Sequence, residues 1–291
     1  MQEPKGLVAF AGTVKMKIRA GYKISYDCPQ PTPMIITLSV HPGRRADLVT
    51  EDALYADPAL APNIEYVDGF GNICHVVQAP AGKLSISSDF IIRDGGEPDV
   101  VAPEAKQQPM EALPVDTLVY LMGSRYCETD RLSELAWAKF ATVPKGWTLV
   151  QTICDFVHEH LTFGYPYARA TRTAFEAFDE GRGVCRDFAH LAITLCRCMN
   201  IPARYCTGYL GDIGVPPEEA PMDFSAWFEV YLGDRWYTFD ARHNIPRIGR
   251  ILIARGRDAT DVAITTSFGV CNLVGFEVVT DEVVDDERVI A

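Results

Sequence analysis

The stretch "GRGVCRDFAHLAITLCRCMNIP", residues 181–202, restricts the fold of this chain more than any other segment. Apolar residues recur at helical spacing from Cys185 to Met199, and Pro202 cannot extend a helix. The spacing predicts a helix that begins near Cys185 and directs this residue along the apolar face, toward whatever packs on it. Glycines at 181 and 183 allow the backbone to approach closely just before the helix.

The elements around this helix predict an α+β fold. Helical patterns precede it in "DTLVYLMGSRYC", "SELAWAKFAT" and "TLVQTICDFVHEHL", and strand patterns follow in "ARYCTGYL", "SAWFEVYL" and "RWYTFDAR". Helices followed by strands within one unit indicate a helical layer on an antiparallel sheet. The acidic segment 214–223, "GVPPEEAPMD", precedes the second strand and has the composition of a loop over a site.

The second and third of these strands are expected to form a hairpin. Gly233-Asp234 suits a two-residue turn that pairs Leu232 with Arg235. Continued along the strands, this register makes Ser225, Trp227, Asp240 and Arg242 share one face. It leaves His243 on the opposite face unless a bulge or the end of the strand turns it back.

The first part of the chain reads as β structure. "TVKMKIRAGYKISY" and "KLSISSDFIIRD" alternate, and turn signals such as "VDGFGN" separate such runs. We predict a β-rich sandwich or barrel domain over 1–97, a linker rich in Pro, Gly and acidic residues over 98–114, and the α+β core with the C-terminal strands over 115–291.

Composition narrows the choice of partners. The net charge of −12 and pI near 5.0 disfavour nucleic acid and anionic membranes, because no basic excess would neutralise phosphates. Neither a secretory signal nor a membrane-spanning run is apparent. We therefore expect a cytoplasmic protein whose partner is a peptide or protein substrate.

The cysteine pattern predicts free thiols. The nine cysteines are scattered through apolar segments, which is typical of a reducing compartment. No CxxC pair occurs, and Cys196 and Cys198 lie roughly 200° apart on a helix, so they cannot face one ion. We expect no metal and no cofactor.

Cys185 stands where a nucleophile would be favoured. Unpaired N–H groups and the positive end of the dipole at a helix start stabilise a thiolate, and the same groups can bind an oxyanion. The alternative is a buried core thiol without chemistry.

The segments "GVCRDFAHLAITLCRCMNIPARYCTGYL", "AWFEVYLGDRWYTFDARHN" and "GRDATDVAITTSFG" resemble the bacterial transglutaminase-like superfamily, in which proteins are described as cysteine proteases. The upstream half resembles the β-rich domain often attached to such cores. The resemblance implies a papain-like core in which Cys185 is the nucleophile and Asp240 the acid of a Cys-His-Asp set. The histidine of the family's "HAW" falls on Ser225.

Ser225 can neither deprotonate a thiol nor protonate a leaving amine near neutral pH. His243 is the alternative base, against a simple role as a surface residue at the end of a strand. For His158 and His160 we expect solvated rings, for His190 a hydrogen bond in the core, and for Tyr165 and Trp227 contact with substrate.

Two functional hypotheses follow. The first is cysteine-dependent acyl transfer on a peptide or amide bond through a thioester at Cys185, with water or an amine as acceptor. The second is a catalytically weak or inactive scaffold that binds peptides in the same cleft.

Overall fold

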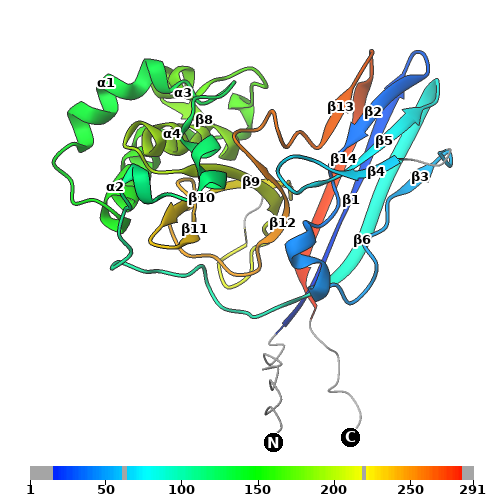
Figure 1. Cartoon of the computed structure of the whole chain (residues 1–291). Helices are drawn as coiled ribbons and strands as arrows, with labels where there is room; N and C mark the ends of the chain where they lie inside the picture. The colour runs from blue at the N-terminus through cyan, green and yellow to red at the C-terminus, as the bar shows by residue number, and fades with distance from the viewer. Residues whose placement is uncertain (1–15, 61–63, 218–220, 284–291) are drawn as a thin grey trace, which may run out of the picture.

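The computed structural model describes residues 16–60, 64–217 and 221–283 and has an α+β fold, which confirms the predicted class. Figure 1 shows the helices and a central sheet on one side and long strands on the other. The helices are α1 (Thr129–Phe140), α2 (Trp147–His160), α3 (Ala174–Glu180) and α4 (Cys185–Cys198). Short 3-10 segments cover Pro42–Asp47, Met110–Ala112, Val115–Leu121 and Tyr165–Tyr167.

The N-terminal β structure consists of two antiparallel sheets. One has the order β14-β1-β6-β3, with bounds Asn272–Glu282, Met16–Cys28, Gly82–Asp94 and Tyr55–Asp57. The other has the order β13-β2-β5-β4, with bounds Thr265–Ser267, Thr32–Ile36, Ile73–Ala79 and Ile64–Val67. Alternate residues of β1 and β6 are buried, as a half-buried strand requires.

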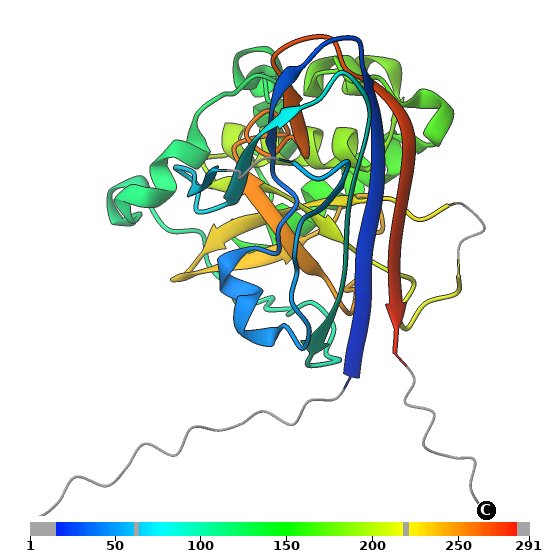
Figure 2. The same cartoon turned by 90° about the vertical axis from the view of Figure 1, so that its right-hand side faces the viewer.

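The C-terminal strands belong to these sheets. β14 pairs along most of β1, so the two long strands run side by side in Figure 2, and β13 pairs with β2. This arrangement differs from the predicted grouping, in which the strands after residue 264 completed the core. Strand patterns indicate that a segment is extended and leave its partner open, because pairing is a long-range choice.

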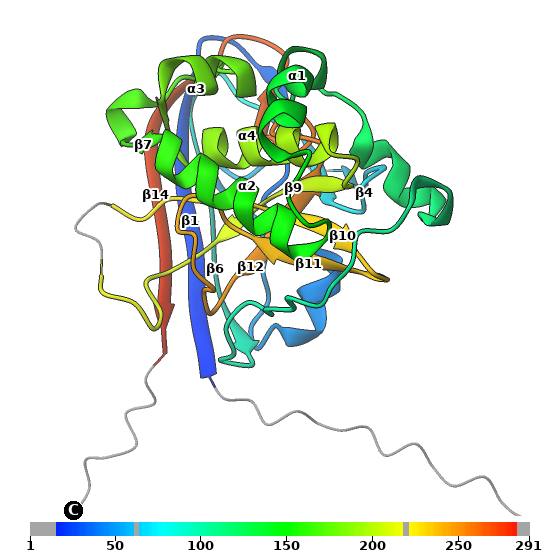
Figure 3. The same ribbon diagram turned by 90° about the vertical axis from the view of Figure 1, so that its left-hand side faces the viewer.

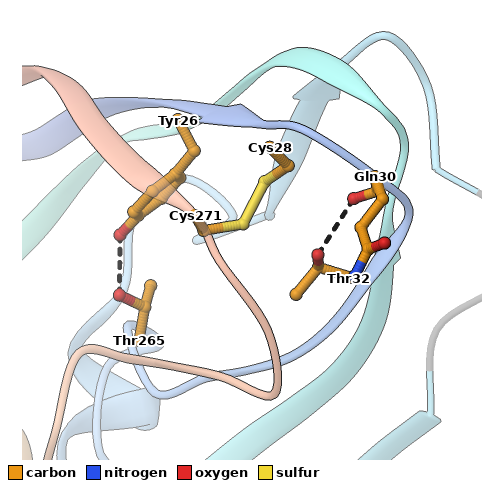
Figure 4. The surroundings of a disulfide bond; sticks show 6 residues. All are labelled: Tyr26, Cys28, Gln30, Thr32, Thr265 and Cys271. Atoms are coloured by element: carbon orange, nitrogen blue, oxygen red, sulfur yellow. Dashed lines mark hydrogen bonds between the residues drawn. A yellow bond between two sulfur atoms is a disulfide. The ribbon is translucent and has the colours of Figure 1, made fainter.

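A disulfide joins the end of β1 to the residue before β14, Cys28 to Cys271, across 243 residues of sequence (Figure 4). The expectation of free thiols throughout was therefore wrong at these two positions. The remaining cysteines of the described chain are free, and most are buried as predicted. Cys28 and Cys271 meet because β14 lies antiparallel beside β1.

The central sheet has the order β11-β10-β9-β12, with bounds Arg235–Phe239, Ser225–Leu232, Ala203–Tyr209 and Ile251–Gly256. Its hairpin has the predicted register, from Leu232 opposite Arg235 to Phe228 opposite Phe239, and Gly233 at the turn has a φ of 62°. A two-stranded parallel sheet, β7 (Thr162–Phe163) and β8 (Arg182–Gly183), leads into α4.

Helix α4 is the centre of the core. One side contacts β9 and β10, and α1, α2 and α3 surround the rest, so almost every residue from Asp187 to Cys198 is buried (Figure 3). The N-terminal sheets contact the other part of the molecule, where the rings of Phe90 and Tyr209 lie 5.7 Å apart. No helix in the three described ranges has the length and apolar character needed to cross a membrane.

Candidate active site

Cys185 is the first residue of α4, and its side chain is partly exposed. The backbone before it is fixed by Asp187, whose Oδ2 accepts the Val184 N–H at 2.9 Å and pairs with Arg172 Nη1 at 3.0 Å. Gly183 is required for this packing, because a Cβ there would lie 2.6 Å from the Asp187 side chain. The predicted close backbone approach is thus found at Gly183, two residues before the helix begins.

Cys185 borders a cavity of about 40 Å³. Such a volume holds a few water molecules. The other residues that line it are Tyr165, Leu210, Gly211, Asp212, Pro221, Met222, Asp223, Phe224, Ser225, Arg242, His243 and Arg247. The predicted covering loop contributes 221–223, and its residues 218–220 lie outside the described chain.

The electrostatics of Cys185 differ from the expectation of a helix-stabilised thiolate. Burial raises the pKa of Cys185 to about 11. Arg242 and the Ala226 N–H oppose this increase, while Asp223 and Asp240 add to it. The thiol is consequently neutral near pH 7, and its use as a nucleophile requires a base.

Ser225 stands at the start of β10, is buried, and lines the cavity beside Cys185. It pairs with Gly208 of β9. The position that resembles the family's histidine therefore lines the same cavity as Cys185, and its side chain is a hydroxyl.

A histidine reaches the same cavity from another position. β11 ends at Phe239, and the chain turns so that Nδ1 of His243 lies 2.8 Å from Oδ2 of Asp240. Oδ1 of Asp240 accepts the backbone N–H groups of Arg242 and His243 at 3.0 and 3.1 Å. The end of the strand thus turns His243 back toward the site, which is the exception that the hairpin register allowed.

Asp240 is ionised. Its burial alone would raise the pKa, but Arg250 and the hydrogen bond from His243 hold the pKa of Asp240 below its usual range. Nη2 of Arg250 lies 3.0 Å from Asp240 Oδ2, and its Nε lies 2.9 Å from Asp99 of the predicted linker. Two residues after Asp240, Arg242 lies over the ring of Phe163 at 3.8 Å.

Comparison with known proteins identifies the fold in which this site lies. The model of the transglutaminase-like superfamily matches residues 137–241, which include Cys185, Ser225 and Asp240 and end two residues before His243. Residues 137–241 belong to the transglutaminase-like superfamily.

The similarity to one solved structure extends beyond this transglutaminase-like core. A Cytophaga hutchinsonii protein described as a "putative cysteine protease" is 29% identical, with a TM-score of 0.80 over 93% of this chain and 92% of its own. An uncharacterized protein of Mycobacterium leprae is 26% identical over 68% of this chain and 73% of its own length. One of Mycobacterium tuberculosis is 29% identical over 72% and 73%.

The two aromatic residues predicted to contact substrate lie in different places. Tyr165 lines the Cys185 cavity and is 39% exposed. Trp227 is buried beneath Arg250, 5.0 Å away, and lines a separate cavity of about 430 Å³ between the N-terminal β structure and the transglutaminase-like core. Trp227 therefore supports Arg250 and does not border the cavity of the thiol.

The other histidines of the core are engaged with backbone groups. His190 is buried and accepts the Ala259 N–H at 3.1 Å, as expected for a core histidine, and burial lowers its pKa to about 3. We expected solvated rings for His158 and His160, but one ring nitrogen of each lies within hydrogen-bonding distance of a backbone carbonyl. Nδ1 of His158 lies 2.9 Å from the Arg242 carbonyl, and Nε2 of His160 lies 2.7 Å from the Phe178 carbonyl.

Several groups at the site were missed by the sequence reading. Arg247, Asp212 and Arg250 follow no local motif, and they arrive from the loops after β9 and β11. The sequence indicates Asp223 only as part of an acidic loop. Within the described residues, no cluster of three or more His, Cys, Asp or Glu side chains has the arrangement of a metal site.

Proposed function

We propose that the protein is a cysteine-dependent acyl-transfer enzyme that acts on a peptide or amide bond, with Cys185 as nucleophile and His243 as general base. One observation carries the proposal. The imidazole of His243 is hydrogen-bonded to Asp240 at 2.8 Å and lines the cavity that Cys185 borders. A nucleophile, a base and a carboxylate that orients the base form the minimal set for this chemistry.

The chemistry follows from the assignment of the two ring nitrogens. Asp240 is ionised and accepts at Nδ1 of His243, so Nδ1 carries the proton and Nε2 is the basic nitrogen. Nε2 takes the proton of the Cys185 thiol as sulfur adds to the substrate carbonyl. The tetrahedral intermediate expels the amine, which receives that proton from the imidazolium, and a thioester remains. Water or a second amine then attacks the thioester and releases Cys185.

The start of α4 would stabilise the intermediate. Backbone N–H groups in the first turn of a helix lack intrahelical acceptors, and the dipole favours negative charge there. The Ala226 N–H of β10 also points at the Cys185 sulfur. These groups are the donors available to an oxyanion beside Cys185, and one such donor typically contributes about 10²–10³ in rate.

The proposal predicts a base-dependent thiol. In wild-type protein, iodoacetamide at pH 7 should label Cys185 faster than the buried thiols, and His243→Asn should reduce that rate by about 10²-fold or more because the neutral thiol loses its proton acceptor. Peptide mass spectrometry after timed alkylation measures both rates. Equal labelling of Cys185 and the buried cysteines in wild type would reject the enzyme.

A second function is supported by a specific observation. A hydroxyl at position 225, where the resemblance places the family's histidine, suits a scaffold that binds peptides without turnover. Such a protein would show peptide binding that is insensitive to Cys185→Ser, together with slow alkylation of Cys185. The alkylation experiment therefore separates the two functions. The predicted cytoplasmic location and the peptide partner stay predictions under either.

A further inference from the structure

The turn that carries His243 is held by hydrogen bonds from two sides. On one side, Oδ1 of Asp240 accepts the N–H groups of Arg242 and His243 at 3.0 and 3.1 Å. On the other side, Nδ1 of His158 lies 3.2 Å from the Ala241 carbonyl and 2.9 Å from the Arg242 carbonyl. Backbone carbonyls only accept, so Nδ1 of His158 is the donor.

These four contacts act on two consecutive peptide planes. The plane between Ala241 and Arg242 is bound through its carbonyl by His158 and through its N–H by Asp240. The next plane, between Arg242 and His243, is bound in the same way. Since the two fixed planes determine φ and ψ of Arg242 between them, the positions of the His243 N and Cα atoms are set before the imidazole meets Asp240.

Helix α2 also fixes the residue after His243. Asn244 has a left-handed φ of 52°, and its Nδ2 donates to Asp155 at 2.8 Å. Gln151 donates to the Oδ1 of Asn244 at 2.9 Å. Gln151, Asp155 and His158 are spaced by four and three residues, so they lie on one face of α2. This face, hereafter the α2 row, runs along the turn.

We propose that His158 is a positioning residue for the Asp240–His243 pair. The inference rests on the proposed function, because it assigns His158 a role through the base. His158 touches neither the thiol nor the substrate and acts by its Nδ1–H donor. The neighbouring Asn244 contacts extend the same support along the α2 row. A base supplied by a turn needs such support, since a displacement of about 1 Å can cost roughly 10² in rate.

Two substitutions separate the donor from the bulk of the ring. His158→Phe keeps a planar ring and removes the donor, whereas His158→Asn keeps an N–H near the place of Nδ1. His158 is exposed apart from this contact, so both variants are expected to fold. His160→Phe is the matched control, because His160 lies on the same helix and binds the carbonyl of Phe178 away from the turn.

Two measurements test the positioning role. The first is the rate at which iodoacetamide labels Cys185 at pH 7. The second is the set of ring ¹⁵N shifts of His243, assigned by loss of the signal in His243→Asn. The wild-type ring should show one tautomer with the proton on Nδ1. His158→Phe should lower the rate by about tenfold or more and mix the tautomers, and His158→Asn should restore both toward wild type.

The outcomes distinguish this inference from the proposed function. Slow labelling of wild-type Cys185 would reject the enzyme, while the ring shifts would still test the role of His158. Unchanged shifts and rate in His158→Phe would overturn the inference, as would a His158→Asn variant that behaves like His158→Phe. If His158→Phe fails to fold, His158→Ala removes the same donor at an exposed helix position, where alanine is well tolerated, and should mix the tautomers in the same way.

Discussion

At the scale of single residues, the site consists of one cysteine, one carboxylate and a histidine in an unexpected position. The resemblance places the family's acid at Asp240 and its histidine at Ser225. His243 is bonded to the same carboxylate from three residues later in the chain. The Asp240 carboxylate could thus orient an imidazole supplied by residue 225 or by residue 243.

Replacing Ser225 with histidine tests whether the Asp240 carboxylate can orient only one imidazole at a time. Ser225→His alone should change the alkylation rate of Cys185 little, because His243 and Arg250 already occupy Oδ2 of Asp240. In the His243→Asn background, the same change should recover at least about tenfold of the lost rate, since a general base contributes about 10²–10⁴. A large gain from Ser225→His alone would instead show that His243 is not the base.

Asp240 should also determine part of the pH dependence of stability. Its folded pKa is depressed, so its contribution is present above the unfolded pKa, about 4, and is lost as the pH falls toward the folded value. Asp240→Asn leaves Arg250 buried without one partner and should cost about 3–5 kcal/mol at pH 7. Urea unfolding of both proteins at pH 7 and near pH 3 measures this. A difference that grows as the pH falls would contradict the assignment.

At the scale of elements, the sequence predicts the features that depend on residues close together in the chain. The start of α4 at Cys185 follows from the apolar spacing and Pro202, and the hairpin register follows from Gly233-Asp234. The position of His243 depends on a turn that Asp240 and α2 hold from opposite sides. That turn is a tertiary product, and no spacing within 240–244 predicts it.

Gly183 tests how closely the element before α4 must pack. Gly183→Ala places a Cβ 2.6 Å from the Asp187 side chain and should destabilise the protein by about 1–3 kcal/mol. It should also slow alkylation of Cys185, because the helix start must shift. Gly69→Ala is the control, since a Cβ there meets nothing within 4 Å. Equal unfolding midpoints for the two variants would show that the contact relaxes without cost.

At the scale of the whole molecule, the chain closes on itself. β14 returns to β1, and the transglutaminase-like core lies between the two segments of the β structure in sequence. The sequence patterns predict both the N-terminal and the C-terminal strands. They do not predict that these strands pair with each other, because no local pattern specifies pairing across more than 200 residues. Arg250 also joins the core to the predicted linker, because it binds both Asp240 and Asp99.

The disulfide gives this closure a direct test. Unfolded, non-reduced protein should show seven reactive thiols out of nine cysteines. Cys28→Ser with Cys271→Ser should lower the free energy of unfolding by about 2–5 kcal/mol, since the bridge closes a long loop. Thiol titration and urea unfolding measure the two effects. Nine reactive thiols would mean that the bridge is absent in solution, as expected in a reducing cytoplasm.

The short separation of Asp240 and His243 has a consequence for motion. When an acid and a base come from neighbouring strands, any slippage or fraying between the strands pulls them apart. Here both belong to one tight bend, so thermal fluctuation of the hairpin carries them together and leaves their bond intact. The distance that varies with thermal motion is then the one between the Asp240–His243 pair and the Cys185 sulfur. Heating should therefore slow proton transfer from Cys185 at temperatures at which the hydrogen bond between Asp240 and His243 is still intact.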